Sequence, residues 1–163
     1  MIERLNDRVR RILVVDDHPV VRRGLRELLA HEPNLEVCGE AADAQEALRM
    51  VESLSPDLMI VDISLNGTDG IDLIERVRAQ WPEARMLVSS MHDEETFADR
   101  ALAAGAMGYV CKSEAVSSVL DAIRMVLHGT VYLSPGMTER ILRSHPVSRS
   151  SSGPGVDRPA GAR

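Results

Sequence analysis

The run from Leu58 to Gly70 limits the possible folds of this chain more than any other stretch. Four apolar residues lead directly to Asp62, and a polar loop containing glycine follows before a new apolar period starts at Ile71. An apolar run without alternation is typical of a parallel strand covered on both faces. A carboxylate at the end of such a strand lies where open α/β sheets bind ligands. Taken alone, Asp62 is equally well explained as the N-cap of the next helix. The rest of the chain is needed to choose between a ligand-binding carboxylate and a helix cap.

Apolar runs alternate along the chain with segments of helical periodicity. The expected strands cover residues 11–15, 35–39, 58–61, 85–90 and 108–112. The expected helices cover residues 20–29, 44–54, 71–81, 93–104 and 114–127. Five strands alternating with five helices predict a parallel sheet with helices on both faces. Right-handed crossovers leave few topologies, and we expect an α/β fold, the flavodoxin-like doubly wound (βα)5 sandwich with strand order 2-1-3-4-5.

This strand order predicts a cluster of acids at one edge of the sheet. The first and third strands are neighbours, so Asp16 and Asp17 at the end of the first should meet Asp62 at the end of the third. Three carboxylates in close contact cannot all stay ionised and unpaired, so either one takes up a proton or a cation binds. Oxygen ligands without histidine or thiolate favour Mg²⁺, or Mn²⁺. His18 follows the acids, but its place at a helix start argues against a dedicated zinc site.

The fourth and fifth strands bring further polar groups to the same edge. The fourth ends in Ser89 and Ser90, and the fifth ends in Lys112, the only lysine beside 18 arginines. A Mg²⁺ ion with open positions suits a phosphoryl group, whose oxygens a lysine and a hydroxyl can neutralise and hydrogen-bond. One aspartate is then available as a nucleophile that forms an acyl phosphate.

Three classes of function are compatible with this chemistry. The first is a phosphoaspartate signalling switch. The second is a Mg²⁺-dependent phosphatase or phosphotransferase, which typically has a second acid two residues after the nucleophile, where this chain has Ser64. The third is a flavin-binding module, which needs neutral hydroxyls and glycine after the first strand, where Asp16 and Asp17 would repel phosphate.

Taken together, the motifs resemble the receiver domain of a bacterial two-component response regulator. The matching pieces, in order, are residues 14–19 (VVDDHP), residues 61–65 (VDISL), Asp69-Gly70, the hydroxyl of the fourth strand and residues 105–112 (GAMGYVCK). They cover roughly residues 9–128. The resemblance implies that Asp62 accepts a phosphoryl group from a sensor histidine kinase. It also implies a signalling phosphoacceptor rather than an enzyme acting on an external substrate.

The resemblance assigns a role to each residue that surrounds Asp62. It implies that Asp17 and Asp62 bind Mg²⁺ directly, together with the backbone carbonyl of Ser64. Asp16 would act on the ion through a metal-bound water. Lys112 would pair with the phosphoryl oxygens.

The resemblance also implies how the signal leaves the site. Ser90 would follow the phosphoryl group inward, with Tyr109 as its partner in the switch, while Ser64 and His92 would tune the lifetime of the phosphoryl group. Phosphorylation would then bias a surface built from helix 4, strand 5 and helix 5, or from helices 1 and 5. We expect a phosphorylation-dependent homodimer through such a surface, with candidate contacts at Asp99, Arg100, Asp121 and Arg124.

The segments after Asp17 (HPVVRRGL) and around residue 132 (YLSP) resemble the LuxR/NarL-type subfamily, whose members usually carry a C-terminal helix-turn-helix domain. After residue 143 the chain is rich in Ser, Pro, Gly and Arg, so we expect no recognition helix there. We therefore divide the chain into a receiver domain (9–128), a linker that can form a short helix (129–143) and a disordered tail (144–163). DNA would be bound only through an effector domain that is not recognisable in this chain, within a transcription-regulating two-component system.

Charge and hydropathy limit the remaining partners. The net charge of −6 and the pI of about 5.4 do not match nucleic acid. The longest apolar runs are far shorter than a membrane span, and the N-terminus has no apolar signal segment. We therefore expect a cytoplasmic protein that contacts no membrane. Cys38 and Cys111 lack CxxC spacing, and we assign them no function.

Overall fold

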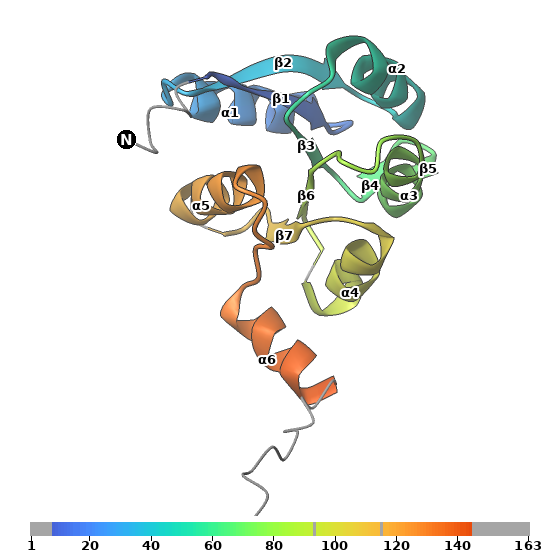
Figure 1. Ribbon diagram of the computed structural model, residues 1–163, viewed down its shortest axis with the longest axis vertical. Helices are drawn as coiled ribbons and strands as arrows, with labels where there is room; N and C mark the ends of the chain where they lie inside the picture. Colours follow the sequence, from blue (N-terminus) through green and yellow to red (C-terminus); the bar gives the residue numbers. More distant parts are fainter. Residues whose placement is uncertain (1–7, 93, 115, 145–163) are drawn as a thin grey trace, which may run out of the picture.

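Five parallel strands form the central sheet of the protein. The computed structural model describes residues 8–92, 94–114 and 116–144 (Figure 1). The sheet has the order β2-β1-β3-β6-β7. Its strands are β1 (Arg10–Val15), β2 (Leu35–Ala41), β3 (Leu58–Val61), β6 (Met86–Ser90) and β7 (Gly108–Cys111). The predicted order 2-1-3-4-5 is confirmed, because the short strands β4 (Ser64–Leu65) and β5 (Thr68–Asp69) pair only with each other, as an antiparallel hairpin.

Helices cover both faces of this sheet, as the sequence predicted. They are α1 (Pro19–Ala30), α2 (Ala44–Leu54), α3 (Gly70–Gln80), α4 (Glu94–Ala104) and α5 (Val116–Leu127). Figure 1 shows α1 and α5 on one face and α2, α3 and α4 on the other. Along β1, Ile12 and Val14 pack in the core between the sheet and α1 and α5. Leu13 and Val15 pack in the core between the sheet and α2, α3 and α4. β3 and β6 are buried at every position because both of their faces are covered, whereas the edge strand β2 is only partly buried.

The ends of the helices follow from local sequence. Pro19 begins α1, where its missing N–H costs nothing. Asp43 caps α2 by accepting a hydrogen bond from the Glu46 N–H at 2.8 Å. The N-cap of α3 is Asp69, whose carboxylate accepts a hydrogen bond from the Ile71 N–H at 2.9 Å. Asp62 is therefore not the cap of α3, and the alternative left open by its sequence context is removed.

The chain after α5 remains attached to the domain. The Tyr132 N–H donates to the Met107 carbonyl at 2.8 Å, beside the open edge of β7. The helix α6 (Pro135–Ser144) follows and contains the two turns that the sequence predicted between residues 137 and 143. Met137 is fully buried, and Arg140 pairs with Asp99 on α4 at 3.4 Å. Residues 145–163, most of the predicted disordered tail, lie outside the described residues.

Shortening a buried side chain in β1 should show how far stability depends on the central sheet. Leu13 is fully buried, so Leu13→Ala should lower the free energy of unfolding by about 2–5 kcal/mol. Val20 on α1 is 82% exposed, and Val20→Ala should change that free energy by less than about 0.5 kcal/mol. Urea denaturation followed by circular dichroism measures both. An equal decrease in the free energy of unfolding of the two variants would contradict the placement of Leu13 in the core.

Candidate functional site

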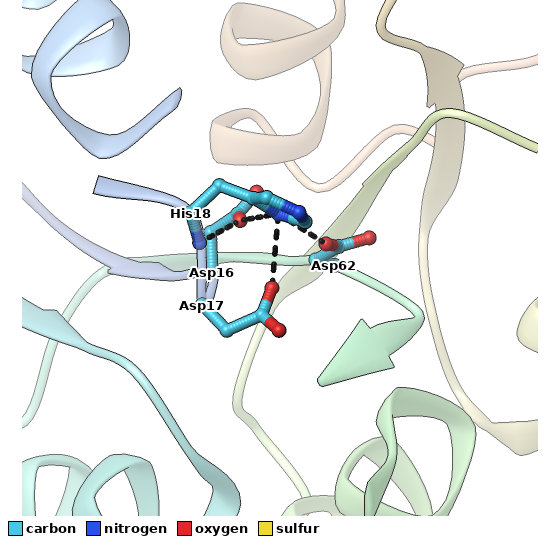
Figure 2. Close-up of side chains that lie close together, drawn as sticks. All are labelled: Asp16, Asp17, His18 and Asp62. Carbon is cyan, nitrogen blue, oxygen red and sulfur yellow. Dashed lines mark hydrogen bonds and ion pairs between the residues drawn. The ribbon is translucent and has the colours of Figure 1, made fainter. Parts of the chain in front are cut away.

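Three acids meet at the carboxyl edge of the sheet, as predicted. Val15 and Val61 are partners in the β1–β3 register, so the residues after them leave the sheet side by side. Asp16 and Asp62 are 2% and 4% exposed, and Asp17 is more exposed. Figure 2 shows these side chains converging together with His18. One ligand atom from each of the four residues lies within 4.8 Å of those from the others.

Lys112 is the cation that faces these acids. Its Nζ donates to Asp16 Oδ2 at 2.6 Å and to Asp62 Oδ2 at 3.2 Å. The Lys112 backbone N–H donates to the Ser90 carbonyl at 2.7 Å, which holds the lysine at the end of β7. The predicted convergence of Lys112 with Asp16 and Asp62 is therefore present in the structure. One ammonium cannot neutralise three carboxylates, so a negative charge remains.

Asp62 lies where burial and negative charge act together. Burial raises the pKa of the Asp62 carboxyl above its ordinary value, and the charge of Asp16 raises it further. Lys112 opposes both effects by its positive charge and its hydrogen bond. The Ser64 N–H also favours the ionised form by donating to Asp62 Oδ1 at 3.3 Å. The Asp62 carboxylate would gain from any further cation at this edge.

The donor atoms of the site fit a divalent cation. Asp17 Oδ1 is buried and has no hydrogen-bond partner in the described part of the chain. A buried carboxylate oxygen without a partner is costly, and a metal ion would satisfy it. The surrounding donors are mainly carboxylate oxygens, which suit Mg²⁺ or Mn²⁺.

Gly70 allows α3 to begin directly beside Asp62. A Cβ atom at this position would overlap the Asp62 carbonyl oxygen and lie 2.7 Å from the Ile63 Cα. The Gly70 N–H donates to the Ile63 carbonyl at 2.6 Å, which closes the segment into a loop. The strands β4 and β5 form inside this loop around Asn66 and Gly67, and Gly67 has a φ of 72°. The sequence predicts a loop over these residues, and the Asn-Gly pair within it is a hairpin signal.

The residues predicted for the switch are linked by hydrogen bonds around the loop between β6 and α4. Ser90 is fully buried, and its Oγ accepts from the His92 N–H at 3.0 Å. The Tyr109 hydroxyl donates to the His92 carbonyl at 2.8 Å. The His92 ring lies 3.0 Å from Ser64 Oγ through Nε2, and it packs edge-on against Phe97 of α4. His92 thus connects Ser90 with Phe97 on α4 through a hydrogen bond and a ring contact.

His18 is the residue that sequence reasoning left outside the site. Its Nδ1 lies 2.9 Å from Asp17 Oδ1 and 3.0 Å from Asp16 Oδ1. Its position next to the acids was the available signal. The N-cap backbone of His18, with φ of −96° and ψ of 112°, carries the imidazole over the carboxylates.

Comparison with known proteins agrees with this geometry. The family model described as the response regulator receiver domain matches residues 12–124. The transcriptional regulatory protein DegU of Brevibacillus brevis is 30% identical over 145 residues, which are 89% of this chain and 61% of DegU. The transcriptional activator protein ExaE of Pseudomonas putida is 39% identical over 136 residues, which are 83% of this chain and 64% of ExaE.

A comparison with solved structures also finds a response regulator. A LuxR-family two-component response regulator from Aurantimonas sp. SI85-9A1 matches with a TM-score of 0.78 and 39% identity, over 83% of this chain and 97% of that chain. The chain therefore belongs to the response regulator receiver domain family, and its relatives include regulators of transcription. It spans 61% to 64% of the length of the two curated relatives described above. Among the described residues, no helix has the length and apolar character needed to cross a membrane.

The raised pKa of Asp62 predicts how stability changes with pH. The unfolded chain releases the Asp62 proton near the ordinary pKa of about 3.9, whereas the folded chain releases it at higher pH. The folded state therefore loses stability as pH rises from about 3.9 through the folded pKa. Asp62→Asn lacks this loss, so in EDTA it should become more stable than wild type across that interval. Each unit of pKa difference corresponds to about 1.4 kcal/mol.

Urea denaturation at several pH values above 4 measures this difference. Asp72→Asn removes the same charge from an exposed position on α3 and controls for the overall charge of the chain. A stability difference between Asp62→Asn and wild type that does not grow with pH would contradict the raised pKa.

Proposed function

We propose that Asp62 accepts a phosphoryl group from a histidine kinase in a Mg²⁺-dependent reaction. The observation that carries this proposal is the position of the Asp62 carboxylate. It is buried at the end of β3, 3.2 Å from the Lys112 ammonium and beside two further acids. A nucleophile held between a fixed cation and a set of metal ligands suits phosphoryl transfer, which depends mainly on positioning and charge.

The residues of the chain have separate roles in this reaction. Asp17, Asp62 and the Ser64 backbone carbonyl would hold Mg²⁺, with Asp16 acting through a bound water. When bound, the ion supplies positive charge for the phosphoryl oxygens. An Asp62 oxygen attacks the phosphorus of a phosphohistidine, the P–N bond breaks as the P–O bond forms, and the departing imidazole keeps the electron pair and takes up a proton. Lys112 already contacts Asp62 and would move its hydrogen bonds onto the phosphoryl oxygens.

The loop between β6 and α4 would convert this reaction into a signal. The Ser90 hydroxyl can donate its proton to a phosphoryl oxygen on Asp62 while its Oγ still holds the His92 N–H. Movement of Ser90 would carry His92 with it and change the bond from Tyr109 to the His92 carbonyl. The end of α4 would then move, because Phe97 packs against the His92 ring. Ser64 and His92, in contact above Asp62, would control how fast water reaches the acyl phosphate.

The output surface would consist of α4, β7 and α5, or of α1 and α5. Three of the predicted dimer contacts have partners within the chain: Asp99 with Arg140, Arg100 with Asp69, and Arg124 with Glu32. Because α6 already lies on α4, a dimer through α4 would require α6 to move, whereas one through α1 and α5 would not. The output would be transcriptional, as in the relatives, with DNA bound by an effector domain rather than by the receiver.

Labelling with acetyl phosphate tests the phosphoacceptor. Wild type should gain the mass of one phosphoryl group in the presence of Mg²⁺ and gain none in EDTA. Asp62→Asn should gain none in either condition because it lacks the nucleophile, and Asp72→Asn should match wild type. Intact-protein mass spectrometry measures the label. Labelling that persists in Asp62→Asn or in EDTA would contradict the proposal.

Sedimentation velocity tests the dimer. The full chain should sediment as a monomer in EDTA and as a dimer when Mg²⁺ and beryllofluoride imitate the phosphoryl group. Asp62→Asn should stay monomeric under both conditions and serves as the control. A wild-type monomer in both conditions would remove the homodimer from the proposed function.

A further inference from the structure

The metal site contains a nitrogen donor that an ordinary Mg²⁺ site does not need. We propose that His18 Nδ1 is a ligand of this site and makes it prefer divalent first-row transition metals over Mg²⁺. The inference rests on the metal site of the proposed function and adds the choice of metal. Imidazole nitrogen suits ions such as Co²⁺, Ni²⁺ and Zn²⁺, whereas Mg²⁺ prefers oxygen ligands and keeps several waters.

The distances around His18 match those between ligands of one ion. Two ligands at right angles, each about 2.1 Å from a shared ion, lie about 3.0 Å apart. Nδ1 lies 2.9 Å from Asp17 Oδ1 and 3.0 Å from Asp16 Oδ1, and it lies 3.9 Å from Asp62 Oδ2. Figure 2 shows the imidazole pointing between the three carboxylates. Nδ1 therefore occupies the position of a ligand without any change of backbone.

Hydrogen bonding does not account for both short distances. A ring nitrogen carries at most one proton, and the contact with Asp16 Oδ1 has the geometry of a hydrogen bond. Asp17 Oδ1 has no hydrogen-bond partner within the described ranges, although Nδ1 is 2.9 Å away. With its proton directed to Asp16 Oδ1, Nδ1 gives Asp17 Oδ1 no hydrogen bond, so this buried carboxylate oxygen stays unsatisfied. A metal ion bound to Asp17 Oδ1 and to Nδ1, in place of the Nδ1 proton, would satisfy it.

The local backbone leaves the imidazole available for this role. His18 is the N-cap residue of α1, yet its side chain makes no capping hydrogen bond. Pro19 restricts the preceding residue to extended conformations, which directs the His18 side chain toward the mouth of the site. The side chain is 60% exposed, so it can also turn away and leave an all-oxygen site. Mg²⁺ would use that second arrangement, and phosphorylation with Mg²⁺ would not need His18.

The test compares the binding of Co²⁺ and Mg²⁺ to the full, untagged and EDTA-treated chain by isothermal titration calorimetry at neutral pH. Wild type should bind Co²⁺ more tightly than Mg²⁺. His18→Ala should weaken Co²⁺ binding by about tenfold or more and leave Mg²⁺ binding unchanged, since even indirect partners of a metal ligand change affinity by about 10–100-fold. His31→Ala, at the exposed end of α1, is the matched control and should behave as wild type.

NMR of the His18 imidazole gives a readout that does not depend on affinity. Co²⁺ should shift the ring signals of His18 strongly, and Asp17→Asn should abolish this shift. An equal loss of Co²⁺ and Mg²⁺ affinity in His18→Ala, or no loss of either, would overturn the role of His18 while leaving the phosphoacceptor in place. Failure of wild type to bind either ion would overturn the metal site itself, and the proposed function with it.

Discussion

The charge balance at the end of β1 and β3 is the constraint on which the rest of this structure depends. Parallel pairing of the two strands forces Asp16 and Asp62 together, and Asp17 follows them. Lys112 is the single ammonium within reach, and it contacts only Asp16 and Asp62 among these acids. Burial and the charge of Asp16 raise the pKa of Asp62, and Asp17 Oδ1 has no hydrogen-bond partner among the described residues. Keeping these acids together without further positive charge costs free energy, so the site favours the binding of a cation.

The segments packed around Asp62 connect the acidic cluster with the neighbouring helices. Gly70 lets the N-terminus of α3 lie directly against the Asp62 backbone. Ser90 ends β6 and His92 follows it, and three hydrogen bonds link His92 with Ser64, Ser90 and Tyr109. In the function proposed above, a group added to Asp62 would act on α4 through these bonds. Met137 is buried and α6 packs against α4, so α6 is connected to the same helix.

Much of this site could be predicted from sequence because the strands of a parallel sheet end at one edge. The acid pair Asp16 and Asp17, the acid Asp62 and the cation Lys112 each follow the end of a strand, so the strand order alone predicts that they lie together. The sequence did not predict how closely the His18 imidazole approaches the acids. Its position depends on one backbone conformation at the start of α1 and on a rotamer, and neither has a signature in hydrophobic periodicity. The hairpin inside the Asp62 loop was missed because two-residue strands are too short to show a period.

The sequence by itself determined the fold class, the strand order and the residues at the carboxyl edge of the sheet. These follow from apolar runs buried on both faces and from the right-handed crossover, which are properties of the chain rather than of particular contacts. Only the tertiary structure decided that Asp17 Oδ1 has no hydrogen-bond partner within the described residues, that His18 faces the acids and that α6 lies on α4. Those outcomes depend on distances of about 3 Å between side chains from separate elements, and hydrogen bonds and metal coordination are sensitive at that scale. Sequence spacing does not specify side-chain positions that finely.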